Sequence, residues 1–202
     1  TSLVPSAVSG AGGRPFAEQV GKLFSEQADP AAAREALARS GFPTGRKVVL
    51  LASDTAMDKK VGAALQEMWR KNLGVEVEVQ SVAVKVWVDR MMNGDFDLCL
   101  CGWGADYNDP ITFLNLWVTG GPYNGGGYSN PEYDRLVEEA SVCLDEAARF
   151  GLLADCEKTL AHDLPVAPLW WPVANFAERS GVEGIVRHPA GVDLDLKWAR
   201  LK

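Results

Sequence analysis

The chain has 202 residues, of which 47% are hydrophobic and 23% charged, as in an ordinary globular protein that can bury a sizeable core. Its 27 acidic and 20 basic side chains give a formal net charge of -7. This balance argues against a nucleic-acid-binding protein, because phosphate recognition needs clustered Lys and Arg. No apolar run approaches the roughly 20 residues that span a bilayer. We therefore expect one main globular domain.

The first residues lack the pattern of a targeting segment. Residues 1–14 are rich in Ser, Gly and Ala but have neither a cationic start nor a long apolar centre, so they do not match a signal peptide. We expect either that nothing targets this protein or that its true start has been removed.

A helix and a strand are predicted next. Asp29 can cap the helix, Pro30 suits its first turn, and Gly41 can end it. Residues 47–53 (KVVLLAS) form a short β-branched and Leu-rich run, which predicts a strand. Because this run does not alternate between apolar and polar residues, we expect both faces of the strand to be covered.

A second helix and strand follow directly. Apolar side chains recur at spacings of three and four from Met57 to Trp69, with Asp54 or Thr55 as the cap and Gly74 as the stop. Residues 75–79 (VEVEV) alternate strictly, as in a strand with one solvent-facing side.

Residues 87–92 are predicted to form a helix, and residues 96–103 (FDLCLCGW) another buried strand. This alternation predicts an α/β fold with a central mixed, mostly parallel sheet flanked by helices. Such sheets bind ligands beyond the carboxyl ends of their strands. The segment after Trp103 is therefore the first place to look for a binding site.

The second half is predicted to contain a helical hairpin. Asn130 and Pro131 open its first helix, and Asp145 caps the second. Residues 166–171 and 173–178 are apolar runs interrupted by prolines, which favours a bent edge strand. Of the two tryptophans in this strand, Trp170 and Trp171, we expect one to face the core and the other the surface.

The densest candidate functional segment is CGWGADYNDP, residues 101–110. Two glycines flank Trp103, and glycine weakens a strand unless something approaches the backbone closely. A bound peptide would do so, since it can pair with exposed main-chain groups as an added strand. Trp103 could supply a flat apolar wall, and Asp106 a carboxylate for a cation such as the α-amine of a peptide.

A purely conformational interpretation of this segment stays open, because Gly, Asp and Asn are also the common residues of turns and Trp103 could belong to the core. Asp106 and Asp109 resemble a catalytic carboxylate pair. No nucleophile with a base, phosphate loop or cofactor fingerprint accompanies them. We therefore expect no enzyme activity and no cofactor, with Asp109 as a helix cap.

The cysteines and histidines do not form a recognisable metal site. Cys99 and Cys101 would share a strand face with Cα atoms about 6.6 Å apart, near the upper limit for a disulfide. They could bind a soft metal, but no second pair at suitable spacing accompanies them, and core packing is favoured. No strong ligand neighbours either His162 or His188 in sequence. We expect no bound metal and four buried thiols, at Cys99, Cys101, Cys143 and Cys156.

Several motifs along the chain occur in the order found in one family of transport receptors. They are LARSGF at 37–42, MWRKNLGVEVEV at 68–79, GDFDLCLCGWGADYNDPITFLN at 94–115, YSNPEYDRLVEEA at 128–140 and LPVAPLWWPV at 164–173. On these motifs the chain resembles the oligopeptide-binding periplasmic binding proteins (extracellular solute-binding protein family 5) of ABC transporters. The resemblance covers nearly the full length and implies a type II periplasmic-binding-protein lobe, the C-terminal one of two lobes that close over a peptide.

The resemblance also implies a ligand site. In the family a Gly-Trp-x-x-Asp element binds the peptide backbone through its strand and the α-amine through its aspartate. We expect the ligand-binding residues to be Cys101, Gly102, Trp103, Gly104, Asp106 and Tyr107. The expected partners are a peptide or other small solute, the permease subunits and the missing N-terminal lobe. No nucleic acid is expected, and the expected location is extracytoplasmic, in the periplasm or at the cell surface as a lipoprotein.

The resemblance further divides the chain into three parts. We expect residues 1–28 to be a linker or a segment from the preceding lobe, and residues 29–190 to be the ligand-binding lobe. Residues 191–202 would then be a C-terminal segment that packs on the missing lobe. Because receptors of this kind close about a hinge, the isolated lobe is expected to bind ligand weakly or undetectably.

Two departures from the family pattern leave alternatives open. Leu100 and Met91 stand where the well-known oligopeptide receptor has arginines for the ligand's carboxylate, although Arg90 is adjacent. Val84 stands where that relative has a tryptophan near the pocket. The alternatives are the same receptor fold binding a non-peptide cationic solute or a metal complex, or a lobe that contacts the permease without binding solute.

Overall fold

The computed structural model describes residues 2–43, 45–173, 175–188, 190 and 194–202 of the chain. The chain divides into two compact units. Unit 1 comprises residues 1–25, 103–121 and 128–202, and unit 2 comprises residues 26–102 and 122–127. Each unit has a buried apolar cluster of its own, so two cores rather than one stabilise the chain.

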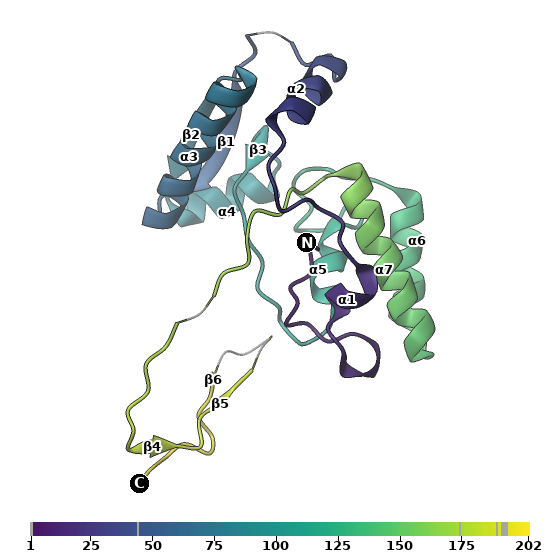
Figure 1. Ribbon diagram of the computed structural model, residues 1–202, viewed down its shortest axis with the longest axis vertical. Coiled ribbons are helices and arrows are strands. Elements are labelled where there is room, and N and C mark those ends of the chain that lie inside the picture. The colour runs from purple at the N-terminus through teal and green to yellow at the C-terminus, as the bar shows by residue number, and fades with distance from the viewer. Residues whose placement is uncertain (1, 44, 174, 189, 191–193) are drawn as a thin grey trace. The chain divides into compact units, whose positions relative to one another are not determined.

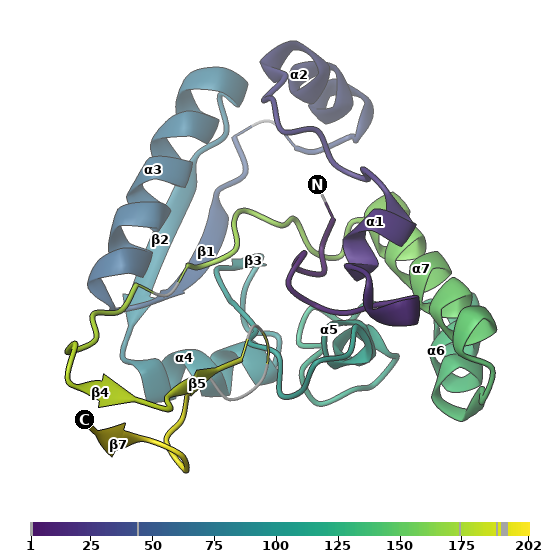
Figure 2. The ribbon, with the colours of Figure 1, turned by 60° about the horizontal axis from the view of Figure 1, so that its bottom comes forward.

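Unit 2 is built on a three-stranded parallel sheet with the strand order β2-β1-β3. Figures 1 and 2 show α3 lying along β1 and β2. The prediction of an α/β fold with a parallel sheet is therefore confirmed, and within this sheet every strand pair is parallel rather than mixed. The elements of unit 2 are α2 (Pro30–Arg39), β1 (Val48–Ser53), α3 (Ala56–Leu73), β2 (Val77–Val82), α4 (Val84–Met92) and β3 (Leu98–Cys99).

Helix α3 begins and ends where its local sequence predicts. The Thr55 hydroxyl accepts a hydrogen bond of 3.2 Å from the Asp58 N–H, and Gly74 ends the helix in the left-handed region with φ 66°. A Cβ on Gly62 would lie 2.9 Å from Cγ1 of Val79, so α3 packs close to β2. A larger residue at position 62 would therefore disturb the packing of α3 against β2.

The two faces of β1 are covered by different helices. Leu50 and Ala52 belong to the apolar cluster that includes Leu65 of α3. Leu51 is also fully buried, and alternation points it to the opposite face, where α4 contacts β1. The expectation that this strand is covered on both faces is thus confirmed.

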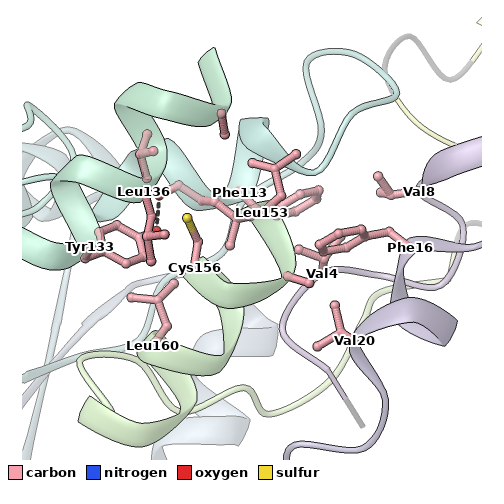
Figure 3. Close-up of a cluster of buried hydrophobic side chains, with 14 residues drawn as sticks. Val4, Val8, Phe16, Val20, Phe113, Tyr133, Leu136, Leu153, Cys156 and Leu160 are labelled. Atoms are coloured by element: carbon pink, nitrogen blue, oxygen red, sulfur yellow. Dashed lines mark hydrogen bonds between the residues drawn. The ribbon is translucent and has the colours of Figure 1, made fainter. Parts of the chain in front are cut away.

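Unit 1 contains the predicted helical hairpin, formed by α6 and α7. The Asn130 side chain accepts hydrogen bonds from the first turn of α6, and Asp145 does the same for α7. Figure 3 shows the apolar cluster of this unit, in which the buried Tyr133 hydroxyl donates to the Leu114 carbonyl. The elements are η1 (Ala11–Gly13), α1 (Phe16–Val20), α5 (Ile111–Leu114), η2 (Asn115–Trp117), α6 (Pro131–Val142), α7 (Glu146–Asp163), β4 (Val182–Glu183), β5 (Val186–Arg187), β6 (Leu194–Asp195) and β7 (Arg200–Leu201).

The N-terminal segment is part of the unit 1 core. Four of its apolar side chains are buried in the cluster shown in Figure 3, at Val4, Val8, Phe16 and Val20. The segment is also held by a carboxylate, because Glu157 of α7 accepts hydrogen bonds from the backbone N–H groups of Leu3 and Val4.

Two strand predictions are wrong. Residues 96–103 contain only the two-residue β3, and Leu98 is 41% exposed rather than buried. Residues 166–173 and 175–178 contain no strand, and Trp170 and Trp171 are both exposed. Short apolar runs do not show by themselves whether a pairing partner exists, and here no described strand pairs with residues 166–173.

Within the described residues, no helix is both long and apolar enough to cross a bilayer.

Candidate ligand-binding site

Residues 101–110 follow β3 in the chain, and parallel sheets present ligand sites beyond the carboxyl ends of their strands. These residues form neither helix nor strand. Cys101 and Gly102 belong to unit 2, and the segment from Trp103 onward belongs to unit 1. The candidate residues are therefore divided between the two units.

In unit 1 the Thr112 hydroxyl connects Trp103 with Asp106. The Trp103 indole N–H donates to Thr112 Oγ1 over 3.4 Å, and the Asp106 backbone N–H donates to the same oxygen over 3.3 Å. The hydroxyl in turn donates to Asp106 Oδ2 over 3.4 Å. Thr112 is only 2% exposed, whereas Asp106 is exposed. The network therefore fixes the chain around Asp106 while leaving its carboxylate at the surface.

Thr112 is not among the residues that the sequence predicts for this site. The available signal was a single hydroxyl in the otherwise apolar run of α5, two residues after the Pro at the N-cap of the helix. A buried hydroxyl needs a hydrogen-bond partner, so such a residue indicates a nearby polar group.

The two glycines beside Trp103 are not explained by conformation or packing. Neither Gly102 nor Gly104 has φ in the left-handed region. A Cβ added at either position would meet no described atom of its own unit within 4 Å. Trp103 itself packs against the apolar cluster of unit 1. A turn therefore does not require glycine at these two positions, while the Trp103 ring is partly a core residue.

Asp109 has a structural role, as the sequence predicts. Its Oδ1 accepts a hydrogen bond of 3.0 Å from the Ile111 N–H at the start of α5. The same carboxylate forms a bidentate ion pair with Arg149 of α7, over 2.7 and 3.0 Å. Asp109 raises the pKa of the Arg149 guanidinium above its ordinary value. Arg149 had no distinguishing sequence signal, since it is 40 residues away from its partner.

We expect Arg149→Met to destabilise the full-length protein by about 1–3 kcal/mol, because the change leaves a half-buried carboxylate without its partner. Methionine keeps an apolar stem at this position, so packing changes little. The measurement is the midpoint of urea unfolding. Arg135→Met is the matched control, since Arg135 pairs with Glu132 and Glu139 on an exposed helix surface. Equal midpoints for the two variants would contradict the structural role of the Asp109–Arg149 pair.

Three further residues of the segment, Cys101, Tyr107 and Asn108, are at the surface. Tyr107 is 50% exposed, and Asn108 forms two hydrogen bonds with Ser9, of 2.9 Å to its backbone N–H and 3.0 Å to its hydroxyl. Cys101 is exposed. These three side chains are therefore accessible within their own units.

The expectation of four buried thiols is wrong. Cys156 is buried, Cys99 and Cys143 are half-buried, and Cys101 is exposed. Strand β3 ends at Cys99, so Cys101 lies beyond the paired part of the sheet. Interaction with the neighbouring thiol raises the pKa of Cys99 and lowers that of Cys101. Among the described residues no three His, Cys, Asp or Glu side chains converge in a way that could hold a metal ion.

Arg90, which is adjacent in sequence to one of the two positions where the family pattern has an arginine, is already paired. Arg90 donates to Asp95 Oδ2 over 2.7 Å and to Gln80 Oε1 over 2.9 Å. Leu100 is 6% exposed and lies in the apolar cluster of unit 2. Within unit 2, neither position therefore presents an unpaired guanidinium.

Comparison with known proteins places the chain in a family. Residues 1–125 match the model of the bacterial extracellular solute-binding proteins, family 5, middle region. The chain belongs to this family. Its members are solute-binding proteins rather than enzymes, which agrees with the prediction from the sequence.

The relatives of this family 5 chain include peptide-binding proteins. It is 34% identical to the dipeptide-binding protein DppE of Bacillus subtilis over 75% of this chain and 28% of the relative. It is 32% identical to the periplasmic oligopeptide-binding protein OppA of Salmonella typhimurium over 74% of this chain and 28% of the relative. The structure of OppA of Listeria monocytogenes bound to peptide matches with a TM-score of 0.81 at 28% identity, over 99% of this chain and 39% of the other. The chain thus spans less than a third of the length of these two curated relatives.

Proposed function

We propose that this chain is most of the C-terminal lobe of the substrate-binding protein of an ABC importer, and that it captures oligopeptides. The proposal rests first on the family, whose relatives carry the names of peptide-binding proteins. In the proposed complex the segment from Cys101 to Gly104 pairs with the backbone of an extended peptide. Asp106 binds the α-amine of the peptide, and Tyr107 lies next to it.

The observation that carries the proposal is the open surface at Gly102 and Gly104. No described atom of its own unit lies within 4 Å of where a side chain at either glycine would be, and their φ angles do not require glycine. A ligand backbone that approaches closely supplies a reason for both residues. The exposed Asp106 carboxylate, fixed through Thr112, is a suitable partner for a primary amine.

The proposal includes the rest of the receptor as a partner. Four large apolar side chains near the C-terminus are 43% exposed or more, at Leu194, Leu196, Trp198 and Leu201. We propose that they pack on the missing N-terminal lobe, because exposed apolar side chains in such number indicate an interface. The proposed division of the chain keeps residues 1–28 and 191–202 as its flanking segments, although residues 191–193 lie outside the described residues. The permease subunits are the proposed second partner. The proposed location of the receptor itself is extracytoplasmic, in the periplasm or at the cell surface with a lipid anchor.

A second candidate ligand is a non-peptide cationic solute. Arg90 is paired with Asp95, and position 100 is a buried leucine, so neither supplies an unpaired arginine. This favours a cationic solute that has no carboxylate, since arginine is the usual partner of a carboxylate. One relative, at 28% identity, is named as a probable deoxycholate-binding periplasmic protein, so non-peptide ligands are named among the relatives.

We expect Asp106→Asn in the full-length receptor to weaken binding of short peptides by about tenfold or more, because a charge-assisted contact to the amine is lost. Calorimetric titration with a mixed library of short peptides measures the change. N-acetylated peptides should bind the wild type as weakly as free peptides bind the variant. Gly104→Ala should weaken binding as well, while leaving the unfolding midpoint unchanged.

Asp155→Asn is the matched control for charge, because Asp155 is exposed on α7 and pairs with Lys158. It should bind peptides like the wild type. Tight peptide binding that is indifferent to Asp106→Asn and to acetylation would remove Asp106 from the site. A receptor that binds no peptide but binds a cationic solute in an Asp106-dependent way would replace the first candidate with the second.

A further inference from the structure

Asn108 joins the segment that carries the proposed ligand residues to the N-terminal segment of the chain. Its side-chain oxygen accepts a hydrogen bond of 2.9 Å from the Ser9 backbone N–H, and its side-chain amide donates one of 3.0 Å to the Ser9 hydroxyl. The two residues are 99 positions apart, and both belong to unit 1. Because the oxygen and the amide of one side chain both bind the same residue, the contact fixes orientation as well as distance.

Ser9 occupies a firmly held part of the N-terminal segment. The residues on either side of it, Val8 and Gly10, are buried. Val8 accepts a backbone hydrogen bond of 2.9 Å from Phe16, and both side chains belong to the apolar cluster of unit 1. Gly10 donates a backbone hydrogen bond of 2.6 Å to the Arg14 carbonyl. A side chain that is hydrogen bonded to Ser9 is therefore anchored to the core.

The ligand segment itself is held less firmly between Ala105 and Asp109. Ala105 packs against the apolar cluster, Asp109 is held in its ion pair, and the three residues between them are exposed. The hydrogen bonds of Asp106 with Thr112 are 3.3 and 3.4 Å long, which exceeds the common range of about 2.7–3.2 Å. The two hydrogen bonds of Asn108, at 2.9 and 3.0 Å, are therefore the stronger restraint on this loop.

Such a restraint matters for the proposed contact with an amine. Only Tyr107 lies between Asn108 and Asp106 in the chain, so a movement of Asn108 shifts the neighbouring carboxylate. A carboxylate that is held in position binds a ligand more tightly than a mobile one, because less conformational freedom is lost on binding. A displacement on the order of 1 Å is enough to weaken a directed contact. The Ser9 contact therefore affects how firmly the amine of a ligand is held.

We propose that Asn108 is a positioning residue for the amine site, and that its contact with Ser9 makes ligand affinity depend on the N-terminal segment. This inference rests on the proposed function, in which Asp106 binds the α-amine of a peptide. It adds residues 1–28, which the proposed division treats as a linker or a segment from the preceding lobe, to the parts of the chain that set the affinity. Asn108 acts through the loop and not by touching the ligand.

Calorimetric titration of the full-length receptor tests the effect on binding, with a mixed library of short peptides and with the same library after N-acetylation. Asn108→Ala should weaken binding of the free peptides by roughly 3- to 10-fold, because part of the free energy of two neutral hydrogen bonds passes to binding. Binding of the acetylated peptides should change by less than about twofold, since they lack the charged amine. In the Asp106→Asn background, Asn108→Ala should likewise add less than about twofold.

Two further variants complete the binding test. Ser9→Ala keeps the backbone hydrogen bond to Asn108 and removes the hydroxyl, so it should weaken free-peptide binding less than Asn108→Ala does. It also provides the test if Asn108→Ala does not fold. Asn93→Ala is the matched control, because Asn93 is an exposed asparagine of unit 2 whose side chain donates to the Asp89 carbonyl over 2.9 Å. The control should bind free peptides like the wild type.

Amide hydrogen exchange of the receptor without ligand tests the positioning step separately. The Asp106 N–H donates to Thr112 and not to Asn108, so its exchange rate reports a change that has passed along the loop. We expect this rate to rise by about fivefold or more in Asn108→Ala and to stay unchanged in Asn93→Ala.

An unchanged exchange rate at Asp106 would overturn the proposal, whatever the receptor binds. Equal weakening of free and acetylated peptides by Asn108→Ala would also overturn it, because the loss would then not concern the amine. A wild type that binds free and acetylated peptides equally would contradict the proposed function, and with it the amine site that Asn108 is proposed to position.

Discussion

Gly125→Ala is expected to destabilise the full-length protein by about 2–4 kcal/mol, although the change adds a single methyl group to a loop. The added Cβ would lie 1.8 Å from the Met91 carbonyl oxygen, near the end of α4. That oxygen also accepts a hydrogen bond from Gly94, so it cannot move away without losing another contact. A clash with backbone cannot be relieved by a side-chain rotation. The loop over residues 122–127 must therefore move as a whole.

The neighbouring residue offers a matched control. A Cβ on Gly126 would meet no described atom of unit 2 within 4 Å, and its φ is not in the left-handed region. Gly126→Ala should change the free energy of unfolding by less than about 0.5 kcal/mol. The measurement is urea unfolding, with amide hydrogen exchange of residues 122–127 as a local readout. Equal effects of the two alanines would show that the close approach to Met91 does not stabilise the loop.

The stability of the protein should fall as the pH rises from about 5 to 8, and Glu157 is the residue responsible. Burial raises the pKa of this carboxyl group to about 7 from its ordinary value of 4.5, although two backbone N–H groups act in the opposite direction. The folded state then binds more protons than the unfolded state between these two values. The stabilising contribution is fully present below pH 4.5 and is lost as the pH rises through 7. Its size is on the order of 3 kcal/mol.

Glu157→Gln isolates this contribution. Glutamine keeps an oxygen to accept the N–H groups of Leu3 and Val4 but does not ionise. The variant should match the wild type near pH 5 and exceed it in unfolding free energy by about 2–3 kcal/mol near pH 8. Unfolding midpoints of both proteins across this range measure the difference. Parallel pH profiles for the two proteins would mean that Glu157 has the same pKa in the folded and unfolded states.

Local signals in the sequence predicted the helices well. Thr55 and Gly74 mark the two ends of α3, and Asn130 and Asp145 cap α6 and α7. These residues are recognisable because capping residues act on backbone groups within one turn. Strand lengths were predicted less well. The apolar run over residues 96–103 satisfies the pattern of a strand, yet only Leu98 and Cys99 pair with β1. Each residue of a strand needs a hydrogen-bonding partner on the neighbouring strand. The local sequence does not indicate where that neighbouring strand ends.

The candidate site shows the same division. The glycines, Trp103 and Asp106 stand out in the sequence because their residue types are unusual at the end of an apolar run. Thr112 and Arg149 became visible only in the structure, since each acts on a residue 6 or 40 positions away. The arginine expected for a ligand carboxylate could be questioned from the sequence, but the structure shows that Arg90 is held by Asp95 and Gln80.

By itself the sequence determined the class of fold, the positions of the helices, the segment after β3 as the candidate site, and the family. These follow from periodicity, capping and motifs, all of which act between residues close along the chain. Tertiary structure alone decided that the N-terminal segment is held by the buried Glu157, that Gly125 lies against Met91, and that Cys101 is exposed while Cys156 is buried. Each of these depends on which surfaces meet when distant segments pack, and burial of a charge, a backbone or a sulfur is a property of that packing.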